Sequence, residues 1–162
     1  MQVLDNFLPA DDFKKIQDTV LSPEFTWTYW HRVGDENDPP EWLWNSKFVH
    51  IPFQDTQLTS ALNMLSPFIN DLRLEVKAMK RIIINSYPYT QTVEKHAPHE
   101  DYDYPHKGAL LNLTTCNGFT YVEGKEIKSV ENRVILFNPS LPHYGTTTSN
   151  SKRRVIINFN YF

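Results

Sequence analysis

The sequence predicts an α+β fold in which β-structure dominates. Two stretches in the first half of the 162-residue chain carry apolar residues at helical spacing, whereas the pattern from residue 75 onward is that of short alternating strands. Helices followed by many short strands are typical of a strand-rich core that helices brace on one face. We therefore expect a single domain over 1–162, with helical and loop support in 1–74 and the β core in 75–162.

Two helices are expected. The first covers Asp11–Leu21 and has two acids in its first turn, where the helix dipole favours negative charge. The second covers Thr56–Leu72 and should kink or restart at Ser66, because Pro67 has no N–H to donate within a helix. The buried face of the first helix would carry Phe13, Ile16 and Val20.

The segment between the helices, residues 22–54, is expected to be irregular. It contains a turn-rich stretch at 34–40 and all four tryptophans of the chain, Trp27, Trp30, Trp42 and Trp44. An irregular segment of this length in a compact domain is commonly a functional lid. We expect part of it to fold over the active site, with packing under the β core as the alternative for most of the tryptophans.

The strands follow residue 75. They are expected at Val76–Tyr87, Ala109–Thr115, Phe119–Val122, Glu126–Val130, Arg133–Asn138 and Arg154–Tyr161. Alternate residues of a strand share a face. In the last strand one face is uniformly apolar and suited to packing beneath the helices: Val155, Ile157 and Phe159.

The other face of the last strand is too polar for a core. It carries Arg154, Ile156, Asn158 and Asn160. This face is therefore expected to line a site, with Arg154 rather than Arg153 as the inward cation. The alternative is that both arginines are solvated charges at the strand edge.

Composition excludes several classes of protein. The net charge is −3 with a pI near 6.0 and no basic block, so an electrostatic footprint for nucleic acid is missing. The first residues lack the pattern of a signal peptide, and no apolar run reaches the ~20 residues that span a bilayer. The single Cys116 excludes an internal disulfide and a cysteine-based metal site. We expect a cytoplasmic protein that binds neither nucleic acid nor membrane.

The residues that carry chemistry begin with His99-Glu100-Asp101. His143 follows at the end of an apolar strand, and Arg154 then opens the last strand. Two histidines and one carboxylate are the ligand set of a non-haem Fe(II) facial triad, which leaves three coordination positions open. On an extended segment His99 and Asp101 point the same way and Glu100 points away, so Glu100 is not expected to be a ligand.

In these residues, and in the opening Asn6-Phe7-Leu8-Pro9, the chain resembles the 2-oxoglutarate/Fe(II)-dependent oxygenases of the prolyl-4-hydroxylase type, in particular the short kind carried by phages. The resemblance implies a double-stranded β-helix core, a relative of jelly-roll and cupin barrels, braced by N-terminal helices. It implies Fe(II) held by His99, Asp101 and His143, with 2-oxoglutarate as cosubstrate, O2 as oxidant and ascorbate in support. Host cytoplasm would be the location if the protein is phage-encoded.

The resemblance also implies a cosubstrate site. Arg154 would pair with the C5 carboxylate, to which a planar guanidinium binds in a bidentate manner. Tyr87 would add a second contact and Asn85, on the same face of its strand, a further one. Asn112, a polar residue among leucines, is another candidate. The alternative for Tyr87 is a core tyrosine whose hydroxyl is satisfied by the backbone.

Three further residues lie at or beside positions of the family pattern. His96 and His106 flank the triad motif and are expected to be surface histidines or ordering contacts rather than a fourth ligand. The strand that usually reads Gly-Gly-x-x-Phe in the family begins Gly118-Phe119 here, which could alter the mouth of the cavity.

The expected reaction is hydroxylation of a C–H bond, with a prolyl residue of a peptide or protein as the leading substrate. A free amino acid or another small metabolite is the alternative. A cupin-type metal enzyme that is not an oxygenase would not need Arg154, and a non-catalytic binding module would have lost part of the triad. For the oligomeric state, the sequence is compatible with a monomer and with a dimer.

Overall fold

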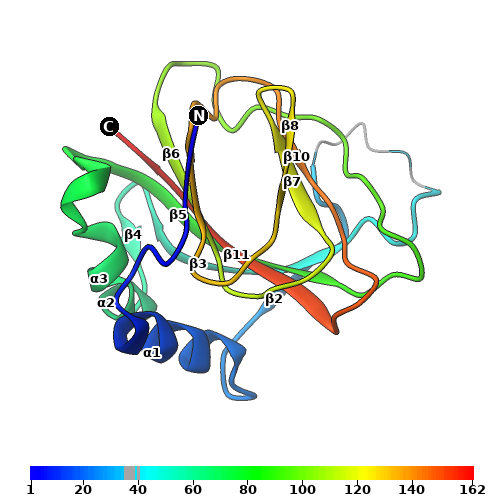
Figure 1. Ribbon diagram of the computed structural model, residues 1–162, viewed down its shortest axis with the longest axis horizontal. Helices are drawn as coiled ribbons and strands as arrows, with labels where there is room; N and C mark the ends of the chain where they lie inside the picture. The colour runs from blue at the N-terminus through cyan, green and yellow to red at the C-terminus, as the bar shows by residue number, and fades with distance from the viewer. Residues whose placement is uncertain (35–38, 40) are drawn as a thin grey trace.

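Two antiparallel sheets form the protein, as the computed structural model shows for residues 1–34, 39 and 41–162. The larger sheet has the strand order β1-β9-β6-β11-β5-β3-β2, with β4 paired to β3, and the smaller has the order β10-β7-β8 (Figure 1). In the larger sheet the strands are β1 (Gln2–Leu4), β2 (Thr28–Trp30), β3 (Lys47–Gln54), β4 (Gln57–Leu58), β5 (Met79–Pro88), β6 (Lys107–Asn112), β9 (Val134–Phe137) and β11 (Arg153–Tyr161). In the smaller sheet they are β7 (Phe119–Val122), β8 (Lys125–Lys128) and β10 (Tyr144–Gly145).

The expected mainly-β class is confirmed, and the helices lie together on one side of the larger sheet (Figure 1). Helix α1 spans Ala10–Leu21. The second expected helix is broken into α2 (Ala61–Met64) and α3 (Ser66–Ile69), followed by the 3-10 turn η1 (Leu72–Leu74). The restart at Ser66 is the one expected from Pro67, which occupies the first turn of α3, where no N–H is needed.

The expectation of an irregular segment over 22–54 is wrong for two parts of it. Thr28–Trp30 forms the edge strand β2, and Lys47–Gln54 forms β3, which pairs along β5. The β3–β5 register shifts between His50 and Phe53, where Pro52 lies. Such an irregularity accommodates a proline, which cannot donate to the ladder, and it hid the strand pattern in the sequence. Most of the turn-rich 34–40 stretch lies outside the described residues.

The core lies between the larger sheet and the helices. Val155, Ile157 and Phe159 of β11 are fully buried there, as their shared apolar face predicts. From the helices, Ile16 and Phe68 join the same cluster, and the ring of Phe68 meets Phe159 edge-on. The opposite face of β11 looks toward the smaller sheet, so one strand separates the core from the polar interior.

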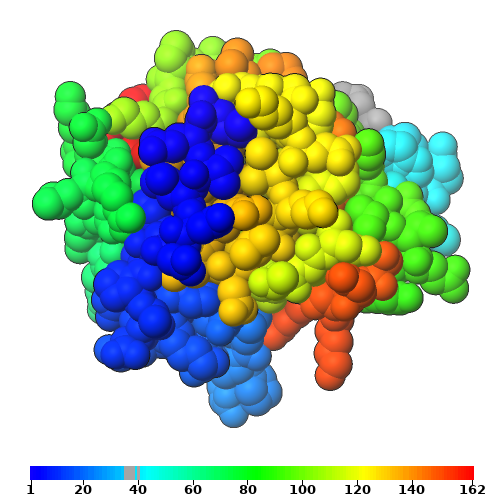
Figure 2. All heavy atoms as spheres, viewed as in Figure 1, coloured from blue at the N-terminus to red at the C-terminus, as the bar shows by residue number. Residues whose placement is uncertain are grey.

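The N-terminal strand covers one edge of the larger sheet. It pairs with β9, and the Met1 ammonium forms an ion pair with Glu123 in the turn between β7 and β8. Figure 2 shows this segment lying beside the β7–β8 region on the surface. None of the described helices is long and apolar enough to cross a membrane.

Replacing Phe159 by Ala tests the core. We expect the free energy of unfolding to fall by about 3–5 kcal/mol, because the substitution leaves a cavity between the sheet and α3. Leu72→Ala is the matched control, since Leu72 is 92% exposed and its loss should change stability by less than about 0.5 kcal/mol. Denaturant unfolding of both variants makes the measurement, and equal stabilities would contradict this placement of the core.

Candidate metal centre and cosubstrate pocket

His99, Asp101 and His143 lie together between the two sheets. One potential ligand atom from each lies within 4.8 Å of the others, which is the spacing of groups around a single ion. The backbones of His99 and His143 form an isolated antiparallel bridge, in which each N–H donates to the other's carbonyl at 2.9 and 3.0 Å. The N–H of Asp101 donates to the carbonyl of Pro139 at 2.9 Å. Backbone pairing therefore brings together ligands that are far apart in the sequence.

Both histidines are oriented for metal binding. The Nδ1 atom of His143 lies 2.9 Å from the carbonyl oxygen of Leu141, and that of His99 lies 3.4 Å from the carbonyl oxygen of Ala97. A carbonyl only accepts, so Nδ1 carries the hydrogen and Nε2 keeps its lone pair. Hydrogen bonding at the second ring nitrogen is the usual way in which proteins orient a metal-binding histidine. Burial, with His143 beside it, also lowers the pKa of His99 and favours its neutral form.

The carboxylate of Asp101 is held at both oxygens. Arg81 Nη2 donates to Oδ1 at 2.8 Å, and Asn158 Nδ2 donates to Oδ2 at 3.0 Å. Burial opposes ionisation of Asp101, but the positive charge of Arg81 and the hydrogen bond from Asn158 hold the pKa of this carboxyl below its ordinary value. Asp101 is therefore an anion with a fixed orientation, as a metal ligand requires.

Arg154 lies deep between the sheets, as the strand alternation predicts, whereas Arg153 is partly exposed on the other face. Its Nη2 donates to Thr120 Oγ1 at 2.6 Å and its Nη1 to the carbonyl of Thr146 at 3.2 Å. Its buried Nε has no hydrogen-bond partner within the part of the chain that the structure describes. A buried guanidinium with an unused donor suits an anionic partner.

Two glycines make room for Arg154. A Cβ at Gly118 would lie 2.8 Å from Arg154 Cδ and 2.5 Å from the carbonyl oxygen of Thr147, and one at Gly145 would lie 3.1 Å from Arg154 Nη1. Gly118 is thus required where it stands. Phe119, the departure from the family pattern, packs against Tyr144 and does not line the cavity, so it does not reshape the mouth.

A cavity of about 320 Å³ lies in front of these groups. Its lining includes the inward residues of β5, which are Arg81, Ile83, Asn85 and Tyr87. The Tyr87 ring lies 5.6 Å from the Arg154 guanidinium carbon, and burial raises the pKa of Tyr87 to about 12, so its hydroxyl remains a donor. Asn85 is buried, and its Oδ1 has no partner among the described residues.

Asn112 lies outside the cavity wall and bonds to neighbouring segments. Its amide donates to the carbonyl of Arg133 at 3.1 Å, and its Oδ1 accepts from the Ser129 hydroxyl at 2.9 Å. It does not line the cavity. The amide instead ties β6 to the turn before β9, which explains a polar residue among leucines.

His96 and His106 are buried rather than on the surface, which corrects one of the two expectations for them. His96 Nδ1 lies 3.1 Å from Asn45 Oδ1, and its ring packs on Tyr87. His106 Nε2 lies 3.1 Å from Asn160 Oδ1. Both therefore act as ordering contacts, and neither belongs to the cluster of potential metal ligands among the described residues.

The four tryptophans lie in three different environments. Trp30 lines the cavity, whereas Trp27 packs against the core cluster. Trp42 and Trp44 stack on each other, and Trp44 also contacts the His96 ring.

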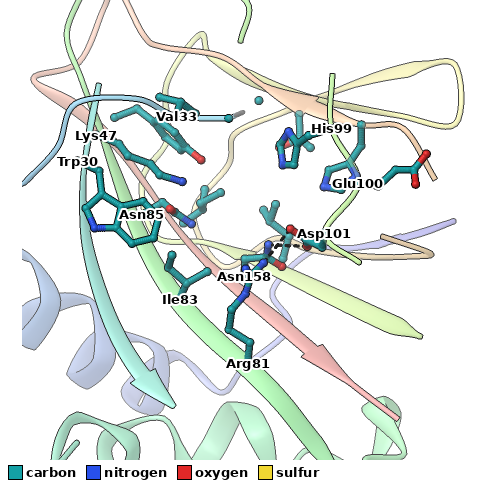
Figure 3. A pocket seen from close by; sticks show the side chains of 17 residues that line it. Trp30, Val33, Lys47, Arg81, Ile83, Asn85, His99, Glu100, Asp101 and Asn158 are labelled. Atoms are coloured by element: carbon teal, nitrogen blue, oxygen red, sulfur yellow. Dashed lines mark hydrogen bonds and ion pairs between the residues drawn. The ribbon is translucent and has the colours of Figure 1, made fainter. Parts of the chain in front are cut away.

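The sequence analysis did not predict that Arg81 and Lys47 line the cavity (Figure 3). Alternation along β5 from Tyr87 could have found Arg81.

Comparison with solved structures identifies the fold. A prolyl hydroxylase from Trichoplax adhaerens, in complex with a peptide fragment of the hypoxia-inducible-factor oxygen degradation domain, aligns with a TM-score of 0.64 and 15% identity over 99% of this chain and 82% of that one. A 2OG-Fe(II) oxygenase family protein from Burkholderia pseudomallei aligns with a TM-score of 0.66 and 16% identity over 98% and 83%. The chain has the fold of the 2-oxoglutarate/Fe(II) oxygenases.

The same fold carries other chemistry. The non-haem α-ketoglutarate-dependent epimerase SnoN of nogalamycin biosynthesis aligns with a TM-score of 0.66 and 10% identity over 99% of this chain and 76% of that one. No protein-family model matches the sequence, and the search of curated proteins gives no match. The structural similarity confirms the double-stranded β-helix expected from the sequence.

Removing the Asn158 amide should weaken metal binding. In Asn158→Ala, Oδ2 of Asp101 loses its donor and the carboxylate is less well oriented, so we expect metal affinity to fall about 10–100-fold. Asn63→Ala, at an exposed position in α2, is the control. Calorimetric titration of each metal-free variant with Fe(II) under anaerobic conditions measures the effect. Unchanged affinity in Asn158→Ala would contradict this role.

His96 should make the metal-free protein less stable in acid. Burial, with Arg154 and Lys47 nearby, lowers its pKa to about 3, whereas an unfolded chain protonates histidine near 6.5. Its contribution is thus fully present above pH 6.5 and is lost as pH falls toward 3, by up to about 1.4 kcal/mol per unit.

We expect His96→Asn to lose less stability than the wild type between pH 7 and pH 5, because Asn does not titrate. Denaturant unfolding at both pH values, with a chelator present, gives the two slopes. The other acid-sensitive groups are common to both proteins and cancel. Equal slopes would mean that His96 is protonated in the folded protein.

Proposed function

We propose that the protein is a 2-oxoglutarate- and Fe(II)-dependent oxygenase that hydroxylates a C–H bond, with a prolyl residue of a peptide or protein as the leading substrate. One observation carries the proposal: His99, Asp101 and His143 line one cavity, and the buried Arg154 lies directly behind the wall of that cavity, bonded to Thr120 and next to Tyr87, which both line it. A triad alone fits many metal enzymes. The guanidinium of Arg154 would bind the distal carboxylate of a five-carbon dicarboxylate whose other end chelates the ion.

The side chains would divide the work. His99, Asp101 and His143 hold Fe(II) on one face, so the remaining positions stay open to cosubstrate and oxygen. Arg154 binds the distal carboxylate of 2-oxoglutarate, and Tyr87 donates a hydrogen bond to it, with Asn85 as a further contact. Iron and cosubstrate, when bound, supply the oxidising power, and the protein supplies orientation and exclusion of side reactions. The apolar side chains of Ile83, Leu110 and Ile156 in the cavity wall restrict water.

Two other classes fit the residues less well. A cupin-type isomerase would have no role for Arg154. Burying its charge costs free energy unless an anion compensates it. A binding module without catalysis would not need three oriented ligands and two bonds to Asp101. A peptide substrate is supported by the peptide complex of the Trichoplax relative. The SnoN relative supports the small-molecule alternative.

The activity test uses the cosubstrate alone. Purified protein given Fe(II), ascorbate and 2-oxoglutarate should form succinate, and a peptide library should then stimulate that turnover. Arg154→Ala should raise the cosubstrate KM strongly, since the carboxylate loses a buried partner at a cost of roughly 3–5 kcal/mol.

Arg153→Ala is the matched control. Arg153 donates to the carbonyl of Leu21 and stacks near Trp27, on the opposite face of β11 from the triad. Its KM for 2-oxoglutarate should remain that of the wild type. If Arg153→Ala raised the KM and Arg154→Ala did not, the cosubstrate site would be assigned to the wrong face of β11.

A further inference from the structure

A second pocket, of about 250 Å³, lies on the face of the larger sheet that is turned away from the metal ligands. Its described lining consists of Trp27, Phe48, Ser86, Pro88, Lys152 and Arg153. The register places Phe48 of β3 opposite Ser86 of β5. It also places Pro88 of β5 opposite Arg153 of β11. By strand alternation Arg153 shares its face with the core residue Val155, so the pocket continues the face on which the core lies.

Aromatic side chains form two walls of this pocket and extend around its rim. Trp27 is half-buried, whereas Phe48 is exposed and its ring lies 5.5 Å from that of Tyr29. Tyr29 is 57% exposed. Tyr89, whose N–H donates to the carbonyl of Lys152, is 52% exposed. The apolar surface is therefore larger than the pocket itself, and exposed patches of this kind mark sites of interaction.

The pocket carries positive charge, and no acidic side chain belongs to its described lining. Arg153 Nη2 donates to the carbonyl of Leu21 at 3.0 Å, and the guanidinium carbon lies 5.9 Å from the Trp27 ring. Burial alone lowers the pKa of Arg153, so no carboxylate of the described chain offsets its charge. Lys152 is exposed at the rim and has no ion pair with a described residue. These cations favour an anionic ligand.

The wall of the pocket also carries an unused hydrogen-bonding group. Ser86 is only 3% exposed and lines the pocket. Its hydroxyl has no hydrogen-bond partner in the part of the chain that the structure describes. Buried hydroxyls are normally hydrogen-bonded, and a hydroxyl can donate to a carboxylate. A carboxylate between Ser86 and Arg153 would satisfy the hydroxyl and compensate the guanidinium.

The size of the pocket indicates which carboxylate fits. Its volume is below the range of roughly 300–1,000 Å³ that holds a drug-sized ligand, so it suits a single residue. Arg153 and Ser86 lie beside the aromatic walls, so the charge and the apolar group of the ligand have to be adjacent. The last residue of a peptide carries both on one Cα atom. An acidic side chain within a chain brings its charge without an apolar group.

We propose that this pocket binds the C-terminal residue of a peptide or protein partner that ends in an apolar side chain. The carboxylate is bound by Arg153 and Ser86, the side chain lies between the aromatic walls, and the exposed rings at the rim contact the preceding residues. Capture of a C-terminal carboxylate is a recurring mode of peptide recognition. The inference is independent of the proposed function, because the site lies on the other face of β11 from the triad and binds without metal or cosubstrate.

Titration of the isotope-labelled, metal-free protein followed by nuclear magnetic resonance measures the affinity and the place of binding together. The first probe is acetyl-Ala-Pro-Ala-Leu with a free carboxylate. The other probes are its primary amide, the same peptide ending in Ser, and acetyl-Ala-Pro-Ala-Glu amide. The wild type should bind the first probe at least about tenfold more tightly than each of the others. The indole signal of Trp27 should shift, whereas that of Trp30, in the metal cavity, should not.

Single variants separate the charge from the apolar wall. Arg153→Met removes the charge and should abolish the preference for the acid over the amide, whereas Arg153→Lys should retain part of it. Phe48→Ala should weaken binding of acid and amide alike, and its exposed position makes it decisive if Arg153→Met fails to fold. Lys125→Met, at an exposed position in β8, changes the net charge equally and should bind as the wild type does.

Equal affinity for the acid and the amide, no detectable binding of the first probe, or a preference that survives in Arg153→Met would each overturn the proposal. Unchanged binding in Phe48→Ala would do the same. Shifts centred on Trp30 would assign the peptide to the metal cavity instead. Binding of acetyl-leucine as tight as that of the peptide would make the pocket a site for a small acid and would also overturn it.

Discussion

The buried carboxylate of Asp101 is the constraint on which the rest of the site depends. A charge at this depth is stable only if both of its oxygens are compensated. The compensation comes from two strands of the larger sheet, with Arg81 on β5 and Asn158 on β11, while the backbone of Asp101 is bonded to Pro139. The loop that carries His99 and Asp101 is therefore anchored to the larger sheet by the side chain of Asp101.

The alternation of β11 explains how a small protein holds both a core and a charged interior. Val155, Ile157 and Phe159 close the core against the helices, and the residues between them carry Arg154 and Asn158 to the other side. The smaller sheet then covers that polar side, with Thr120 and two glycines fitted around the guanidinium. Apolar burial on one face of β11 stabilises the fold, and this free energy offsets the desolvation of the buried charges on the other face.

Sequence patterns predicted those features that depend on local periodicity. Helix α1, the break at Pro67 and the inward direction of Arg154 all follow from spacing along one segment. Strand β3 was missed because its register shifts around Pro52, so its apolar residues do not alternate throughout. Whether a segment is an inner strand depends on its partner, which a local pattern does not contain.

The same limit applies to the site. The sequence makes Asn85 and Asn112 candidate contacts of the cosubstrate alike, yet Asn112 bonds to Arg133 and Ser129 whereas Asn85 lines the cavity. The role of Arg81 and Asn158 follows from their hydrogen bonds to Asp101, which exist only once β5 and β11 lie beside its loop. Partners of a polar side chain come from distant strands, so the ligand types are readable from sequence while the groups that orient them are not.

In the proposed function, one cavity binds a metal ion and 2-oxoglutarate together. Titration of 2-oxoglutarate into the protein without oxygen, once with Fe(II) and once with a chelator, measures this coupling directly. We predict tight binding with Fe(II) and at least tenfold weaker binding without it, because chelation of the ion adds to the contact with Arg154, and the difference should vanish in His143→Ala. Equal affinity with and without Fe(II) in the wild type, or no binding in either case, would contradict the account.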